Sequence, residues 1–193
     1  DVTGKAPIST RWVDINKGDD EDPECRSRIV AQEIKSIDVY RDDPFAATPP
    51  LEAKKMLFSL ATTEGIGYFG SDTASGMKIE FIDTRRAHYQ AHARRQLYVK
   101  LPAEDHTPGM CGRLNKALQG TRDAAQCWEY EYNKFMVDEL GFKRGLCSPC
   151  TFYHEEQNLR AVIHGDDFTI LGFDNNLDGF KTAITAKWQV KIK

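Results

Sequence analysis

The chain has 193 residues, enough for one substantial core or for two small lobes. Hydrophobic residues make up 40% and charged residues 28% of the chain, as in soluble globular proteins. No apolar run approaches the roughly 20 residues that a membrane-spanning helix needs. The net charge of −3 argues against a general polyanion binder, but residues 84–122 alone carry +6 and the rest −9. A basic centre in an acidic chain is typical of a track for a phosphate backbone, with a solvated surface as the alternative.

The chain begins Asp1-Val2-Thr3-Gly4, without a Met or a charged-then-apolar leader. This start predicts a protein that is not secreted, and a fragment or a piece of a longer polyprotein. Five cysteines, an odd number scattered along the chain, favour a reducing, intracellular compartment over a disulfide-linked secreted domain.

The first third of the sequence predicts a hairpin followed by a helix. Residues 10–16 and 26–32 are rich in strand-forming side chains and flank a polar turn at 17–24. Thr48-Pro49-Pro50 is typical of a helix start, and Gly65 stands where a helix would end. Apolar residues between them follow a period of 3.6, at Ala53, Met56, Leu57, Leu60 and Ala61.

The remaining elements mix strands and helices without strict alternation, which favours an α+β fold. Residues 77–83 alternate as a strand that ends in an acid, and a helix is expected from Thr121 to Gly141. Further strands are expected at residues 151–153, 159–164, 168–172 and 190–192, with a helix over residues 177–188 before the last of them.

The segment His164-Gly165-Asp166-Asp167-Phe168 is the sharpest local signal. Apolar runs lead into and out of it, so a tight hairpin with two adjacent carboxylates at its tip is predicted, because Gly and Asp tolerate the positive φ of such turns. Asp83, at another strand end, would add a third carboxylate. Hard divalent ions prefer one or two carboxylates together with substrate phosphates, so these acids suit metal-assisted phosphoryl transfer if they converge.

Ordered blocks over nearly the whole chain resemble the reverse transcriptases of copia-type retrotransposons. The blocks are Thr10-Arg11-Trp12-Val13, Arg26-Ser27-Arg28-Ile29-Val30-Ala31-Gln32, Phe45-Ala46 with Leu51-Glu52, Phe81-Ile82-Asp83 with Ala87, Leu97-Tyr98-Val99 with Pro102, Leu114-Asn115-Lys116-Ala117-Leu118 with Gly120 and Trp128, Leu140-Gly141-Phe142-Lys143-Arg144 with Pro149-Cys150 and Phe152-Tyr153, and Asp166-Asp167.

The resemblance implies a right-hand polymerase: fingers over residues 1–72, then a palm over 73–193 whose antiparallel sheet is flanked by helices, with a fingers-like basic insertion at about 90–115 and without thumb or RNase H. It implies templated DNA synthesis from dNTPs on an RNA or DNA template-primer, with Mg²⁺ or Mn²⁺, in a cytoplasmic particle or the nucleus. The rest of a polyprotein would be a further partner.

The resemblance also assigns site residues. Asp83 and Asp166 would be the principal metal ligands and catalytic acids, and Asp167 a weaker third. Arg26 and Arg28 would approach the triphosphate of the incoming nucleotide. The stretch 114–122 would lie against the template and the nascent pair, which brings in two further residues, Lys116 and Arg122.

Four departures from the family pattern surround the retained acids. His164-Gly165 replaces a Tyr-Val pair, Ala125 replaces a Pro, and Asp123 replaces a Gln, which places a negative charge near the triphosphate. The aromatic residue that screens the sugar 2′-position is displaced, because His88 holds its position and Tyr89 follows.

These departures leave open an alternative of another class, a catalytically inert scaffold that persists as a subunit of a larger assembly. A two-metal nuclease or phosphatase on a different fold would require the motif order to be accidental. Cys147-Ser148-Pro149-Cys150 with His154, and the pair His88 and His92, have partial zinc-site or redox spacing but no complete ligand set. The three tryptophans are interpreted as core residues.

Overall fold

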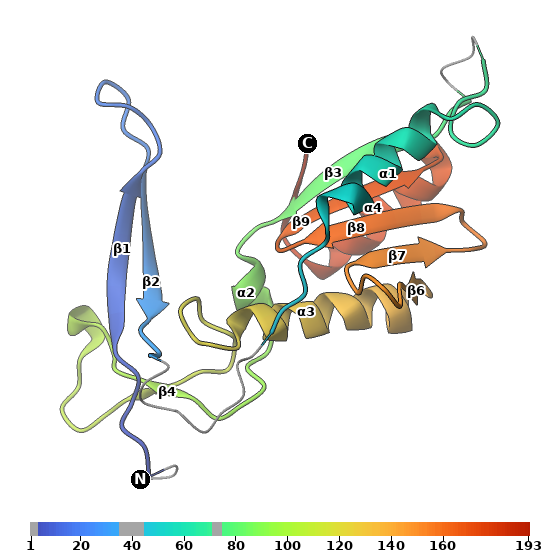
Figure 1. Cartoon of the computed structure of the whole chain (residues 1–193). Helices are drawn as coiled ribbons and strands as arrows, with labels where there is room; N and C mark the ends of the chain where they lie inside the picture. The colour runs from blue at the N-terminus through green and yellow to red at the C-terminus, as the bar shows by residue number, and fades with distance from the viewer. Residues whose placement is uncertain (1–3, 35–44, 71–74) are drawn as a thin grey trace. The chain divides into compact units, whose positions relative to one another are not determined.

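The computed structural model describes residues 4–34, 45–70 and 75–193 (Figure 1). The chain divides into two compact units, each built from two separate segments. Unit 1 comprises Asp1–Phe45 and His88–Trp128, and unit 2 comprises Ala46–Ala87 and Glu129–Lys193. The boundary expected after residue 72 falls at residues 71–74, outside the described residues, and neither unit begins or ends there.

Unit 1 contains the expected N-terminal hairpin. Strands β1 (Thr10–Asn16) and β2 (Cys25–Ala31) pair antiparallel, with Thr10 opposite Ala31 and Asn16 opposite Cys25. The second segment of this unit contributes four short elements: α2 (Ala87–Gln90), β4 (Tyr98–Val99), the 3-10 turn η2 (Ala103–Asp105) and β5 (Gly112–Arg113). A two-residue antiparallel ladder joins β4 to β5.

A small apolar cluster ties the two segments of unit 1 together. Ala31 from the hairpin packs with Val99 and Leu118 from the second segment. The backbone of the second segment adds hydrogen bonds to the hairpin, since the Ala31 amide donates to the Gln119 carbonyl at 2.8 Å. Segments nearly a hundred residues apart thus share one core.

Unit 2 is organised around a six-stranded antiparallel sheet in the order β10-β3-β9-β8-β7-β6. Its strands are β3 (Lys78–Thr84), β6 (Lys143–Arg144), β7 (Thr151–His154), β8 (Leu159–His164), β9 (Asp167–Gly172) and β10 (Val190–Ile192).

Helices cover one face of this sheet. Helix α3 (Ala124–Lys134), which contains the boundary between the units, continues into the π-helical turn η3 (Phe135–Glu139), and α4 (Asp174–Lys187) follows β9. Tyr132 and Trp188 approach the ring of Phe168, with centroids 6.2 and 6.3 Å away. The completely buried side chains of this layer make it the core of the unit.

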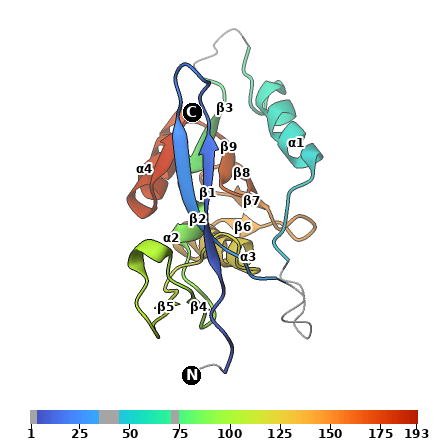
Figure 2. The same cartoon turned by 90° about the vertical axis from the view of Figure 1, so that its left-hand side faces the viewer.

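The opposite face carries helix α1 (Leu51–Thr62). Figure 2 shows α1 and α4 on opposite sides of the sheet. Leu57 of α1 packs on Val162 and Leu171 from the middle of the sheet, so the helix covers one part of this face. Beyond α1, the strand ends on this face carry polar side chains in place of a second buried layer.

The mixture of antiparallel sheets and helices is the α+β arrangement that was expected, and the longer predicted elements are present. In the part of the chain that the structure describes, no helix is both long enough and apolar enough to cross a membrane.

Candidate active site

The predicted Gly-Asp hairpin joins β8 to β9. His164 pairs with Asp167 across the hairpin, so the turn has two central residues, Gly165 and Asp166. Gly165 has a φ of +62°, and Asp166 does not share this left-handed conformation, which is the pattern of a type II′ turn with glycine at its first central position. The Thr84 amide donates to the Asp166 carbonyl at 2.8 Å and joins the turn to the end of β3.

Strand register brings two of the predicted acids together. Asp83 of β3 lies directly opposite Asp167 of β9. Residues directly opposite each other in an antiparallel pair point to the same face, so both carboxylates lie on the face that α1 covers only in part. Lys191 lies opposite Asp83 on the other side, and His164 opposite Asp167, which makes a row of four polar residues across four strands.

The Asp83 and Asp167 carboxylates share one cation. The Lys193 ammonium lies 3.3 Å from Asp83 Oδ2 and 3.2 Å from Asp167 Oδ1. Hydrogen bonding to Asp167, and then to Asp83, raises the pKa of Lys193 above its usual value. Both carboxylates are partly open to solvent, with 35% and 48% of the side chain exposed. The arrangement therefore holds a positive charge at an accessible position.

Asp166 is a central residue of the β8–β9 turn and directly precedes Asp167. Its side chain is exposed in the turn. Among residues 4–34, 45–70 and 75–193, no three His, Cys, Asp or Glu side chains are grouped closely enough to hold a metal ion. The strand register thus sets Asp83 opposite Asp167, and the role of Asp83 and Asp166 as the principal metal ligands stays a prediction.

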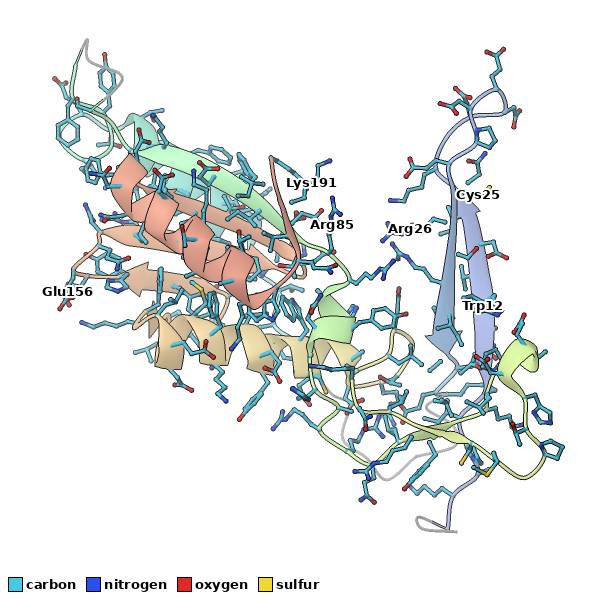
Figure 3. The ribbon with its side chains drawn as sticks, turned by 180° about the vertical axis from the view of Figure 1, so that it is seen from behind. Trp12, Cys25, Arg26, Arg85, Glu156 and Lys191 are labelled. Carbon is cyan, nitrogen blue, oxygen red and sulfur yellow. The ribbon has the colours of Figure 1, made fainter. Side chains whose placement is uncertain are left out.

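The two predicted nucleotide-binding arginines share one face of the β1–β2 hairpin in unit 1. Arg28 lies opposite Val13, and Arg26 lies opposite Ile15. Arg11, opposite Val30, belongs to the same face, so three guanidinium groups line it. Figure 3 shows Arg26 projecting from β2, and Trp12 on β1. Sequence reasoning missed Arg11, although strand alternation at residues 11, 13 and 15 could have identified it.

Trp12 belongs to the other face of this hairpin and is not the core residue that was expected. Its side chain is 48% exposed, and its indole N–H lies 3.4 Å from Glu104 Oε2. The other two tryptophans are buried, as predicted.

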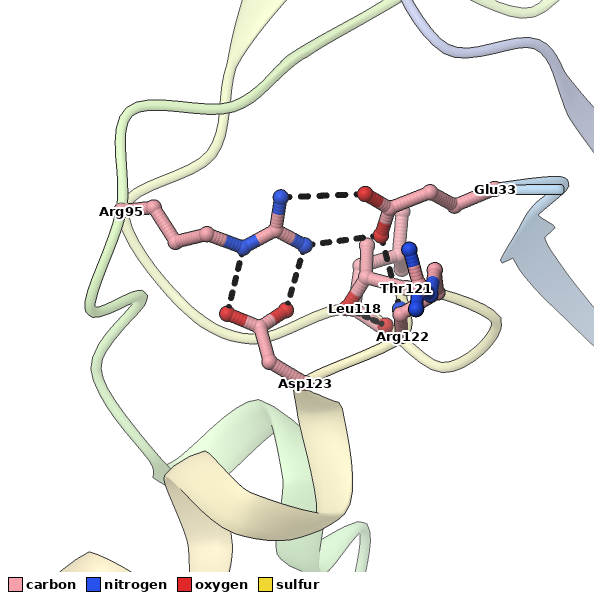
Figure 4. Close-up of polar contacts among 6 residues, drawn as sticks. All are labelled: Glu33, Arg95, Leu118, Thr121, Arg122 and Asp123. Atoms are coloured by element: carbon pink, nitrogen blue, oxygen red, sulfur yellow. Dashed lines mark hydrogen bonds and ion pairs between the residues drawn. The ribbon is translucent and has the colours of Figure 1, made fainter. Parts of the chain in front are cut away.

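Asp123 has an internal partner that the sequence did not reveal (Figure 4). Arg95 donates to both Asp123 oxygens, at 2.6 and 2.7 Å, and to both Glu33 oxygens, at 3.0 and 2.7 Å. Glu33 also accepts the Arg122 backbone N–H at 2.7 Å. Burial by itself lowers the pKa of Arg95, but the hydrogen bonds and charges of Asp123 and Glu33 outweigh it and raise that pKa. Asp123 is 4% exposed, so its negative charge is balanced inside unit 1.

Tyr89 and Lys116 also make contacts within unit 1. The Tyr89 hydroxyl donates to the Ile29 carbonyl at 2.9 Å, which anchors α2 to β2. The Lys116 ammonium donates to the Gln90 carbonyl at 3.0 Å and lies 3.1 Å from His92 Nε2. His88 is half-buried in α2.

The cysteine-rich segment does not form a site. Cys147 is exposed and Cys150 is buried, and all five cysteines are free thiols. Burial raises the pKa of Cys150, which also accepts a hydrogen bond from Tyr132. His154 uses Nδ1 to accept the Gln157 amide at 3.2 Å and packs edge-on against Phe142. Among the residues that the structure describes, these side chains are not part of a group that could hold a metal ion.

Comparisons with known proteins agree with the sequence resemblance. Residues 2–192 match the model of the family described as reverse transcriptase (RNA-dependent DNA polymerase). A curated relative, the retrovirus-related Pol polyprotein from transposon TNT 1-94 of Nicotiana tabacum, is 24% identical over 185 residues, which are 90% of this chain and 13% of the relative. No solved structure matches significantly. The copia-type resemblance is confirmed, and the chain belongs to the reverse transcriptase (RNA-dependent DNA polymerase) family.

Proposed function

We propose that this chain is the polymerase core of a retrotransposon Pol polyprotein and adds dNTPs to a primer 3′-hydroxyl on an RNA or DNA template. The observation that carries the proposal is the register that sets Asp83 opposite Asp167 in a chain that matches the family over residues 2–192. The activity of the whole polyprotein belongs to this proposal too, because the chain spans only 13% of its curated relative.

In this proposal unit 2 is the palm and unit 1 the fingers. The support for the palm is an antiparallel sheet with one face buried by α3 and α4 and the other carrying the acids. The support for the fingers is the hairpin with Arg11, Arg26 and Arg28 on one face, since guanidinium groups bind phosphates in a fork geometry. These arginines would neutralise and orient the triphosphate.

The acids present fit Mg²⁺ or Mn²⁺. Asp83 and Asp167 already hold one cation jointly, the Lys193 ammonium, and oxygen donors are the ligands that these ions prefer. Asp166, adjacent in the turn, would join them. A bound divalent ion would supply charge neutralisation and activation of the attacking hydroxyl. The contribution of the protein would be positioning and fixed charges around an in-line attack.

Asp83 and Asp167 are retained and lie opposite each other, which gives the inert-scaffold alternative no support. The curated relative described above is a Pol polyprotein, which also does not favour that alternative. Asp123, which the sequence counted among the departures near the nucleotide, is compensated by Arg95. This departure therefore no longer weighs against activity.

Primer extension tests the proposal. The purified chain, in excess over a DNA primer annealed to an RNA template, is given dNTPs and Mg²⁺. Extension is expected, and Asp83→Asn or Asp167→Asn should lower its rate by about 10²–10³-fold, as loss of a transition-state contact does. Asp138→Asn, an exposed acid in η3, is the matched control and should change little. Equal extension by Asp83→Asn and wild type would contradict the assignment, and template degradation without extension would favour a nuclease.

A further inference from the structure

Strand β10 and the residue directly after it place two lysines on the face that carries the acids. Lys191 lies opposite Asp83, and Lys193, just beyond the end of β10, follows two residues later on the same side. Figure 3 shows Lys191 beside Arg85, at the end of the sheet where β3 leaves it. Only Lys193 of these two lysines contacts the carboxylates, and it contacts both of them.

We propose that Lys193 is an internal counter-ion that competes with the divalent cation for the Asp83–Asp167 pair. The inference rests on the proposed function, because it takes this pair to be part of the metal site. Two carboxylates directly opposite each other repel, and an ammonium between them removes the repulsion without coordinating as a metal does. The site would then be partly neutralised before an ion arrives, and it would release the lysine when the ion binds.

The contacts of Lys193 would allow its ammonium to leave the two carboxylates while its backbone stays in place. The Lys193 backbone N–H donates to the Phe81 carbonyl at 2.8 Å, which holds the residue in register with β3. Its side chain is 46% exposed on a flexible four-carbon stem, so the ammonium can move into water while the backbone stays in place. Exposed pairs of this kind are weak, so a dication that binds both carboxylates can displace the lysine.

The competition predicts tighter metal binding once the ammonium is removed. Lys193→Met should bind Mn²⁺ about three- to tenfold more tightly than the wild type, the range expected for losing two exposed ion pairs. Lys193→Arg keeps the charge and should stay close to the wild type. Lys191→Met removes the same charge from the same face of the same strand without removing a contact to the carboxylates, and should change the affinity by less than about twofold.

Calorimetric titration of MnCl₂ into the full chain, with thermal unfolding followed in parallel, distinguishes the outcomes. A larger Mn²⁺-induced rise in the unfolding temperature of Lys193→Met than of the wild type is also expected. Unchanged or weaker binding by Lys193→Met, or equal tightening by Lys191→Met, would overturn the counter-ion role. If Lys193→Met binds Mn²⁺ no more tightly than the wild type, but Asp83→Asn abolishes Mn²⁺ binding, the counter-ion role is wrong and the proposed function is still supported. If neither the wild type nor any variant binds Mn²⁺, both the counter-ion role and the proposed function are contradicted.

Discussion

At the scale of single residues, Arg95 holds two carboxylates at once in unit 1. Its side chain is 26% exposed, whereas those of Glu33 and Asp123 are 9% and 6% exposed. Removing one partner of a buried ion pair leaves a buried charge without a counter-charge, which destabilises a protein more than replacing the whole pair with apolar side chains. Arg95→Met should therefore lower the free energy of unfolding by about 3 kcal/mol, measured by urea denaturation.

A matched ion pair on the surface gives the control for Arg95. Lys143 and Glu155 also form a close pair, but their side chains are 71% and 67% exposed. Solvent and salt screen this pair, so Lys143→Met should leave the urea midpoint unchanged within error. Equal midpoints for Arg95→Met and Lys143→Met would show that the cluster around Arg95 does not stabilise the fold.

Sequence reasoning could identify Asp123 as unusual but not as paired. Its partner Arg95 lies 28 residues away along the chain, and Glu33, the second partner of Arg95, lies a further 62 residues away, so no local pattern indicates these contacts. The same limit applies to Lys193, whose contact with Asp83 depends on the register of β10. Charge counts along a sequence therefore overestimate the basic groups that are free to bind phosphate.

At the scale of elements, glycines at turns fix how the strands meet. Gly165, in the β8–β9 turn, has φ +62°, and a Cβ there would meet nothing within 4 Å. Gly120, beside β2, has φ +90°, and a Cβ there would lie 1.9 Å from the Ala31 carbonyl oxygen. Gly165→Ala only places a Cβ on a backbone with positive φ, so it should lower the free energy of unfolding by about 1 kcal/mol. Gly120→Ala must also displace the neighbouring backbone, so it should lower the free energy of unfolding by more than about 2 kcal/mol.

Urea denaturation of the two alanine variants checks this order. A change in the urea midpoint reports a change in stability when the m-value, the slope of unfolding free energy against urea concentration, equals that of the wild type. A Gly165→Ala loss that equals or exceeds the Gly120→Ala loss would contradict the steric argument.

Elements long enough to show a period were predictable from sequence. Alternation located β3, and the apolar runs around Asp166 located β8 and β9 almost to the residue. Strands of two residues, such as β4, β5 and β6, give no period and are fixed by tertiary pairing. The predicted buried face of α1 was only partly right, because Leu57 is buried but Met56 is 55% exposed.

At the scale of the whole molecule, each unit takes its core from two distant segments. Leu57, at 2% exposure, belongs to the first segment of unit 2, whereas Val162 and Leu171, which it covers, belong to the second. Sequence order suggested a division near residue 72, because the motifs of the resemblance run consecutively. Packing instead makes α1 part of the sheet layer that carries Asp83.

Cutting the chain at residue 72 tests this organisation. Fragment 73–193 lacks α1 and the β1–β2 hairpin, so it would expose Val162 and Leu171 to water at about 25 cal/mol per Å² of apolar surface. Neither fragment alone should unfold cooperatively, and mixing them should restore a cooperative thermal transition in near-UV circular dichroism. Leu57→Asp in fragment 1–72 should block recovery, whereas Met56→Asp, on the exposed side of α1, should permit it. A cooperative transition of 73–193 alone, at the midpoint of the intact chain, would mean that α1 contributes nothing to the core, and the division at residue 72 would then describe the fold better than the two units do.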